Sequence, residues 1–212
     1  VQFNGKSVAH TVSECSYPCT EVNLPIPEFK KWSPEEPNLY NVYFSLVRNE
    51  TVIDEIETYC SFREVGIESD GLYINNKRYF QKLILMQGFW KGGGYTAPHT
   101  DSFERDITCA KEMGFNGCRM HMKYEDPRFL YAADRLGFLV WAEAPSFYSF
   151  TEESCCVFRK ELMDVVKRDL LHPSVITWVI GNESWGMRDI TTSKKIQSWV
   201  MEITDLTRSV DP

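Results

Sequence analysis

The chain has 212 residues, a formal net charge of −7 and 43% hydrophobic residues, a composition that excludes a disordered tail. It has no run of Lys and Arg interleaved with aromatic residues, so nucleic acid is not expected as a partner. No apolar stretch approaches the roughly 18 residues that span a bilayer, so no membrane association is expected either.

The seven cysteines form no pair of knuckles with zinc spacing, so we expect reduced thiols and no metal ion. Cys109 and Cys118 are predicted to pack as small apolar groups. This cysteine usage favours a reducing, cytoplasmic compartment. Because the first residue is Val1 and not Met, we expect the chain to be an internal piece of a longer one.

Up to about Phe62 the pattern is all-β. Tyr40–Arg48 and Thr51–Phe62 are rich in β-branched and aromatic residues, and Asn49 between them predicts a hairpin turn. Frequent prolines before residue 40 exclude a helix there. The segment is too short for a complete immunoglobulin-like domain of about 100 residues, so residues 1–66 are expected to be only part of such a β-sandwich.

From about Leu72 the pattern changes to a small hairpin, turning at Asn75-Asn76, and then to strands that alternate with amphipathic helices. The expected buried strands are Leu83–Gln87, Asn116–His121, Leu139–Glu143 and Val175–Ile180. The expected helices begin at Asp101, at Asp126-Pro127 and at Glu152, and a last one carries the stripe Ile196, Trp199, Val200, Ile203 and Leu206.

Two of these helices have clear terminal signals. Asp101 followed by Glu104 predicts a capping box, and Asp126 followed by Pro127 predicts a cap with a first-turn proline. Gly137 is predicted to end the second helix, and the face of the first is expected to include Gly114.

Four strand–helix units are half of what a (β/α)8 barrel of about 250 residues needs. The fold class is therefore expected to be multi-domain, β plus α/β: a partial immunoglobulin-like β-sandwich followed by the first four βα units of a TIM barrel in residues 67–212. An open doubly wound sheet is the alternative, but the glycines at 92–94 lack the G-x-G-x-x-G spacing of a phosphate loop.

In a barrel, the chemistry lies where strands end at their C-terminal side. Glu183 follows the fourth strand directly and has no Lys or Arg nearby in sequence. We expect its carboxyl group to be shielded from solvent at the mouth of an apolar barrel. A shielded carboxylic acid keeps its proton to higher pH, which suits general acid catalysis.

At this point five collinear blocks resemble glycoside hydrolase family 2, the family of β-galactosidases, β-glucuronidases and β-mannosidases. His172–Ser184 looks like the acid/base signature of that family. The remaining blocks are Trp32–Tyr40, Phe62–Ile67, Met113–Arg119 and Asp134–Glu143.

The resemblance implies that Glu183 is the acid/base of a retaining mechanism and that Asn182 binds the sugar 2-hydroxyl; the alternative is that both residues only cap the next turn. It implies that Arg119 braces a nucleophilic glutamate on the seventh strand, about 5–5.5 Å from the acid. No residue of this chain can be that nucleophile, so the piece alone is expected to be inactive.

Other positions depart from the family pattern. His121 is displaced by one residue, so substrate contact and a core or loop role stay open. Phe147 and Ser149 replace the magnesium ligands of large bacterial β-galactosidases, so no metal is predicted and galactose is not assigned as the substrate.

Three tryptophans, Trp90, Trp185 and Trp141, could stack on a sugar, although Trp141 equally fits rim packing. Glu143 could orient Glu183 or Arg119, although a structural ion pair is favoured.

The sequence thus predicts a retaining exo-β-glycosidase for terminal β-linked sugars such as β-galactosides or β-glucuronides, with a carbohydrate substrate and no cofactor. A noncatalytic carbohydrate-binding or scaffold module is the alternative. Because the half barrel leaves its outer strands uncovered, we expect the chain to form a homo-oligomer or to pair with the remainder of its parent chain.

Overall fold

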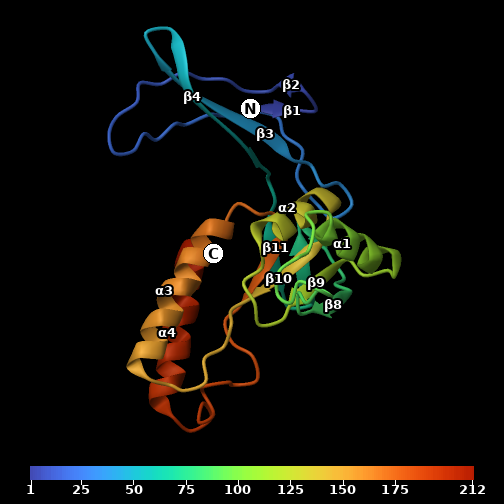
Figure 1. Ribbon diagram of the computed structural model, residues 1–212, viewed down its shortest axis with the longest axis vertical. Helices are drawn as coiled ribbons and strands as arrows, with labels where there is room; N and C mark the ends of the chain where they lie inside the picture. The colour runs from blue at the N-terminus through green and yellow to red at the C-terminus, as the bar shows by residue number, and fades with distance from the viewer.

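The computed structural model describes residues 1–212 and contains one antiparallel and one parallel four-stranded sheet, connected by a small three-stranded sheet (Figure 1). The antiparallel sheet has the order β2-β1-β3-β4, with β1 at Gln2–Phe3, β2 at Lys6–Ser7, β3 at Tyr40–Arg48 and β4 at Thr51–Cys60. Asn49 and Glu50 have φ values of +49° and +61°, which confirms the predicted hairpin turn.

The three-stranded sheet leads into the parallel one. It consists of β5 (Val65–Glu68), β6 (Gly71–Ile74) and β7 (Lys77–Arg78), in that order. Asn75 and Asn76 both have positive φ, as expected for the turn of the predicted hairpin. The fully buried Trp32 packs with Ile74 and Leu139 and donates from Nε1 to the carbonyl of Asp134, which ties this region to the parallel sheet.

The parallel sheet has the order β11-β10-β9-β8, and its strands lie close to the predicted ranges. The strands are β8 (Leu83–Met86), β9 (Gly117–Met120), β10 (Leu139–Glu143) and β11 (Val175–Val179). The helices that follow them are α1 (Ser102–Glu112), α2 (Pro127–Leu136), α3 (Glu152–Asp169) and α4 (Lys194–Val210). Strands and helices alternate along the chain as predicted.

The helix termini follow local chemistry in most places. Asp126 accepts a hydrogen bond from the backbone N–H of Arg128, and Gly137 ends α2 with φ +65°, where a Cβ would strike the carbonyl of Pro34. Asp101 is the N-cap residue of α1, as predicted, but the predicted capping box is absent, because the backbone of Asp101 is already helical and its side chain makes no capping bond. Gly114 is exposed beyond the end of α1, so its predicted place on the buried face is also wrong.

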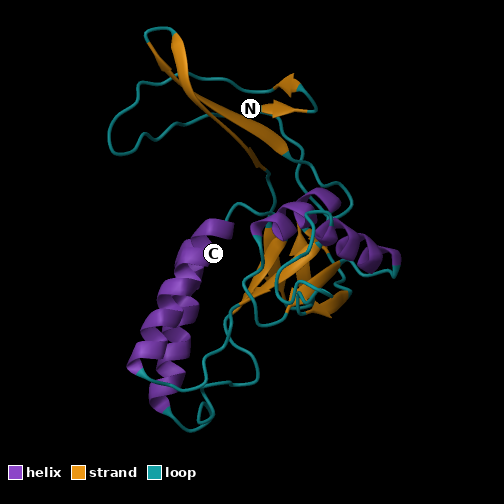
Figure 2. Ribbon diagram, in the orientation of Figure 1, coloured by secondary structure: helices purple, strands orange, loops and turns teal.

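Figure 2 shows α1 and α2 against the parallel sheet and α3 and α4 as a separate pair, and each pair of helices has its own buried core. In the first, α1 and α2 pack against one face of the strands through Phe103, Ile107, Phe129, Cys118 and Met120, among others. In the second, α3 and α4 lie side by side and bury Phe158, Leu162, Val166, Trp199 and Ile203 with Ala144 at the end of β10. None of the four helices combines the length and apolarity needed to cross a membrane.

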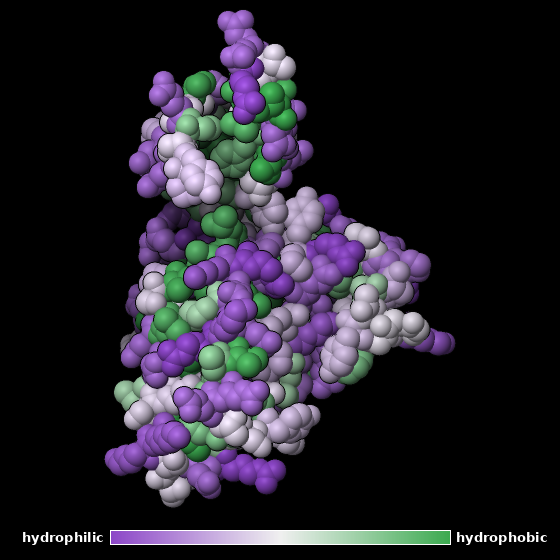
Figure 3. Space-filling model, turned by 60° about the vertical axis from the view of Figure 1, so that its left-hand side comes forward, coloured by the Kyte–Doolittle hydropathy of each residue, from purple (hydrophilic) through white to green (hydrophobic).

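Several apolar side chains remain at the surface. On the β3–β4 hairpin they include Phe44, Val47, Val52, Ile53 and Ile56, and apolar surface also appears on the lower body of the molecule (Figure 3). In the edge strand β8, Leu85 is 55% exposed. All seven cysteines are unpaired; Cys118 is buried as predicted, but Cys109 is exposed, so the prediction that it packs inside is wrong.

Candidate active site

Polar side chains gather where β9, β10 and β11 end, on the face of the sheet opposite α1 and α2. Side chains alternate along a strand. Cys118 and Met120 therefore point into the helix-covered core, and Arg119 and His121 point to the other face. Trp141 pairs in register with Arg119, so Glu143, two residues further, lies on that same face.

Glu143 organises this group. It is fully buried, and it accepts a hydrogen bond from Nε of Arg119 at 2.5 Å and contacts Nδ1 of His121 at 3.2 Å. Arg119 donates its second bond, from Nη2, to Oδ1 of Asn182 at 2.7 Å. A buried carboxylate is tolerated when it is paired and hydrogen-bonded in this way. The ion pair predicted for Glu143 is therefore present, with Arg119 as its partner.

Asn182 starts a tight turn that carries Glu183. Its side chain is buried, and its Nδ2 lies 3.6 Å from Sδ of Met122. Glu183 and Ser184 have φ values of +49° and +58°, a conformation that is uncommon for residues other than glycine and concentrates at functional sites. Gly186, with φ +72°, closes the turn against Phe147, where a Cβ would lie 2.4 Å from the Phe147 carbonyl oxygen.

A cavity of about 260 Å³ opens beside this turn. Its lining residues are His121, Met122, Ser146, Phe147, Tyr148, Asn182, Glu183 and Trp185. Glu183 is the single carboxylic acid among them, and its side chain is exposed. The expected shielding of Glu183 from solvent is therefore wrong for residues 1–212, because none of their side chains covers the carboxyl group.

Two family models together match nearly the whole chain. The model described as "Glycosyl hydrolases family 2, TIM barrel domain" matches residues 65–212, and the model "Glycosyl hydrolases family 2" matches residues 2–63. The chain belongs to glycosyl hydrolases family 2.

Relatives of this family 2 chain include a protein named putative beta-glucuronidase from Formosa agariphila, 29% identical over 86% of this chain and 23% of that protein. The beta-galactosidase BoGH2A of Bacteroides ovatus is 28% identical over 76% of this chain and 20% of that protein. The crystal structure of an FMN-binding beta-glucuronidase from Faecalibacterium prausnitzii superposes with a TM-score of 0.87 at 27% identity, over 98% of this chain and 32% of that one. The chain thus spans about a quarter or less of the length of these curated relatives.

The structure brings together five of the six residues that sequence reasoning selected in this family 2 chain. Glu183, Asn182, His121 and Trp185 line the cavity, and Arg119 supports it through Asn182. Trp90 lies apart: its indole N–H donates to Asp106 at 3.1 Å, and its ring packs edge-on against Phe103. Trp141 is also occupied elsewhere, because its Nε1 donates to Gln81.

Sequence reasoning did not select four of the cavity residues, which are Met122, Ser146, Phe147 and Tyr148. The Oγ of Ser146 is buried without a hydrogen-bond partner in the protein, and Tyr148 is 87% exposed. The Tyr148 ring meets Trp185 edge-to-face at 6.1 Å. These residues lie in loops after β9 and β10, where no periodic pattern marks them, and only the folded loops bring them beside Glu183.

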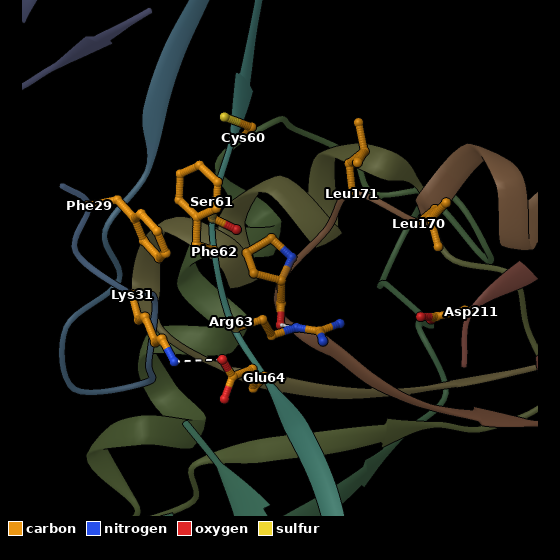
Figure 4. A pocket seen from close by; sticks show the side chains of 11 residues that line it. Phe29, Lys31, Cys60, Ser61, Phe62, Arg63, Glu64, Leu170, Leu171 and Asp211 are labelled. Carbon is orange, nitrogen blue, oxygen red and sulfur yellow. Dashed lines mark hydrogen bonds and ion pairs between the residues drawn. The ribbon is translucent and has the colours of Figure 1, made fainter. Parts of the chain in front are cut away.

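A second cavity of this family 2 chain, of about 360 Å³, lies at the opposite end of the sheet, where β4 leads into β5 (Figure 4). Phe62, Arg63 and Glu64 line it together with Pro173, which precedes β11. Lys31 pairs with Glu64 at 2.7 Å on its rim.

Proposed function

We propose that the protein containing this chain is a retaining exo-β-glycosidase in which Glu183 is the general acid/base. Membership of glycosyl hydrolases family 2 supports this proposal, as do relatives named beta-glucuronidase and beta-galactosidase. In this role Glu183 would protonate the departing glycosidic oxygen and later deprotonate the attacking water.

The observation that carries the proposal is the hydrogen-bonded chain from Glu143 through Arg119 to Asn182. These bonds orient Asn182 relative to the fully buried Glu143. Asn182 directly precedes Glu183, whose carboxyl group is exposed. An oriented amide at this place suits a hydrogen bond to the sugar 2-hydroxyl, which strengthens as oxocarbenium character develops. Rigid support of this kind is what a catalytic group requires.

The nucleophile of a retaining enzyme must stand about 5–5.5 Å from the acid. Glu183 is the single carboxylic acid on the cavity lining, and Glu143 is committed to Arg119 and His121. We therefore place the nucleophile outside residues 1–212. The parallel sheet, within residues 67–212, is then the first half of a (β/α)8 barrel, and residues 1–66 are part of the immunoglobulin-like sandwich.

The substrate proposed is a terminal β-linked sugar, with β-glucuronides and β-galactosides as the candidates. His121 faces the cavity and can contact sugar hydroxyls, and the orphaned hydroxyl of Ser146 is a further candidate donor. Trp185 and Tyr148 present exposed aromatic surface beside Glu183, which suits contact with the apolar face of a sugar or of the leaving group.

The test is hydrolysis by the protein expressed from its complete reading frame, with phenyl and 2,4-dinitrophenyl β-glucuronides and β-galactosides. Glu183→Gln should lower kcat/KM for the phenyl glycoside by about 10²–10⁴, because that leaving group needs a proton. It should leave kcat/KM for the 2,4-dinitrophenyl glycoside nearly unchanged, because that leaving group departs as an anion.

The matched control is Glu112→Gln, an exposed glutamate at the end of α1, which should change neither rate. A Glu183→Gln variant that hydrolyses both substrates normally would contradict the assigned role. A wild-type protein that binds these sugars without hydrolysing them would instead support a carbohydrate-binding module.

A further inference from the structure

The segment between β4 and β5 crosses the N-terminal end of β11, the strand that leads to Glu183. From this segment Arg63 donates twice to β11 and the residues before it: Nε to the carbonyl of Pro173 at 2.7 Å and Nη2 to that of Val175 at 2.6 Å. Figure 4 shows the guanidinium group of Arg63 directed away from the Lys31–Glu64 pair. A planar guanidinium can bridge two acceptors in this manner.

On the side that faces β10, residues 173–175 are held by two further hydrogen bonds of Ser174. The backbone N–H of Ser174 donates to Oδ1 of the fully buried Asp134 at 3.0 Å, and the carbonyl of Ser174 accepts from the N–H of Val140 at 2.8 Å. The carbonyls of Pro173 and Val175 therefore point to the side away from β10. No strand pairs with that edge of β11, and Arg63 satisfies both groups there.

The register of β11 changes at this place. Val140 pairs with Val175, but the next residue, Trp141, pairs with Thr177, so Ile176 is an extra residue in β11. Such a bulge redirects the side chains after it, because successive side chains along a strand point to opposite faces. After the bulge Glu143 pairs with Val179, three residues before Asn182.

We propose that Arg63 is a positioning residue for Glu183. By holding the carbonyls that precede the bulge, Arg63 keeps the bulge at Ile176, and the bulge sets the direction in which the turn at 182–186 leaves β11. The connection between the sandwich and the barrel therefore acts on the acid/base from the far end of the strand. This inference rests on the function proposed above for Glu183.

The experiment compares leaving groups in the protein expressed from the complete reading frame. Arg63→Lys keeps the charge but loses the planar fork, so it cannot bridge both carbonyls in the same geometry. We expect kcat/KM for the phenyl glycoside to fall by about tenfold, a fraction of the full general-acid contribution, while that for the 2,4-dinitrophenyl glycoside changes less than about twofold. Arg63→Gln should lower the phenyl rate further with the same dependence on the leaving group.

The matched control is Arg78→Lys, which removes a comparable two-pronged contact, to the carbonyl of Asp70, on an exposed hairpin. It should leave both rates unchanged. Hydrogen exchange of residues 176–186 should become faster in both Arg63 variants and stay unchanged in the Arg78 variant.

An equal loss with both substrates, or no loss with either, would overturn the positioning role, since a purely structural defect does not distinguish leaving groups. Glu183→Gln measured in parallel separates the two proposals. If Glu183→Gln shows the leaving-group dependence and the Arg63 variants do not, only the inference about Arg63 fails. If Glu183→Gln does not show it, the proposed function fails first.

Discussion

Arg119 donates from Nη2 to Oδ1 of Asn182 across 2.7 Å, and this bond joins β9 to the turn that follows β11. The two residues are 63 positions apart in the chain. Nε of the same guanidinium donates to the buried Glu143. Arg119 therefore connects Asn182 to a buried carboxylate in the interior of the sheet. The neighbouring Glu183 thus has a rigid support although its own side chain is exposed.

A double-mutant cycle on Arg119→Lys and Asn182→Ala should measure this bond directly. We expect a coupling of about 1–2 kcal/mol in the free energy of unfolding, in the lower range for hydrogen bonds to a charged group because Arg119 is 31% exposed. The measurement is urea denaturation of the four proteins. The surface pair Arg135 and Glu104 is the reference cycle and should couple by less than about 1 kcal/mol. Additive effects of the Arg119 and Asn182 variants would refute the link.

Glu143→Gln should lower the free energy of unfolding by about 2–3 kcal/mol. This is less than the about 3–5 kcal/mol typical of breaking a fully buried ion pair, because Arg119 keeps partial contact with solvent. Chemical denaturation checks the value. Glu104→Gln, which breaks an exposed ion pair with Arg135, should change stability by less than about 1 kcal/mol. Equal effects of the two substitutions would show that Glu143 is not the anchor of the site.

Gly186→Ala should disturb the turn that carries Glu183. The added Cβ meets Phe147 at 2.4 Å at a φ of +72°, so we expect a loss of about 3 kcal/mol, in which overpacking adds to the unfavourable backbone conformation. Gly92→Ala has a similar φ of +83° but open space around it, and should lose only about 1–2 kcal/mol. Thermal unfolding of both variants separates the two contributions. Equal losses would mean that the contact with Phe147 is relaxed without cost.

Glu125→Gln should change the pH dependence of stability. Burial raises the pKa of Glu125 above its ordinary value, against the opposing effects of its backbone bond from Asp126 and of Lys123. The stability contributed by this group is therefore complete below the unfolded pKa of about 4.3 and is lost as the pH rises through the higher folded pKa. The unfolding free energy of the variant, minus that of the wild type, should rise with pH across this window.

Glu64→Gln provides the control of opposite sign for that measurement. The hydrogen bond from Lys31 lowers the pKa of Glu64, so the wild type gains stability from it above the unfolded pKa and loses it as the pH falls. The difference between this variant and the wild type should fall as the pH rises. Urea denaturation at several pH values tests both signs, and parallel curves for the two variants would contradict the assignment.

Local chemistry explains which elements were predictable. The turn at Asn75-Asn76 and the ends of α2 at Asp126 and Gly137 follow from side chains that interact with their own neighbours in sequence. The strands β8 to β11 were recognisable because short apolar runs that alternate with amphipathic helices are typical of a parallel sheet. The capping box predicted at Asp101 did not form, although the sequence pattern is present. The backbone of Asp101 is helical, and its side chain makes no capping bond.

The sequence predicted most of the residues of the site but not their arrangement. Residues at strand ends, together with the resemblance to family 2, were sufficient to select Arg119, His121, Asn182, Glu183 and Trp185. Neither the cavity residues Ser146 and Tyr148 nor the place of Trp90 outside the cavity could be read from the chain, because loop conformations depend on contacts with distant segments.

The amino-acid sequence by itself determined the order of strands and helices, the family and the identity of the candidate acid, since these depend on local periodicity and on short motifs. The tertiary structure alone decided that Glu143 reaches Asn182 through Arg119, that Ile176 bulges from β11 and that Arg63 holds the residues before it. Each of these relations joins residues from different strands or segments. Their geometry depends on strand register and packing, which exist only after the chain has folded.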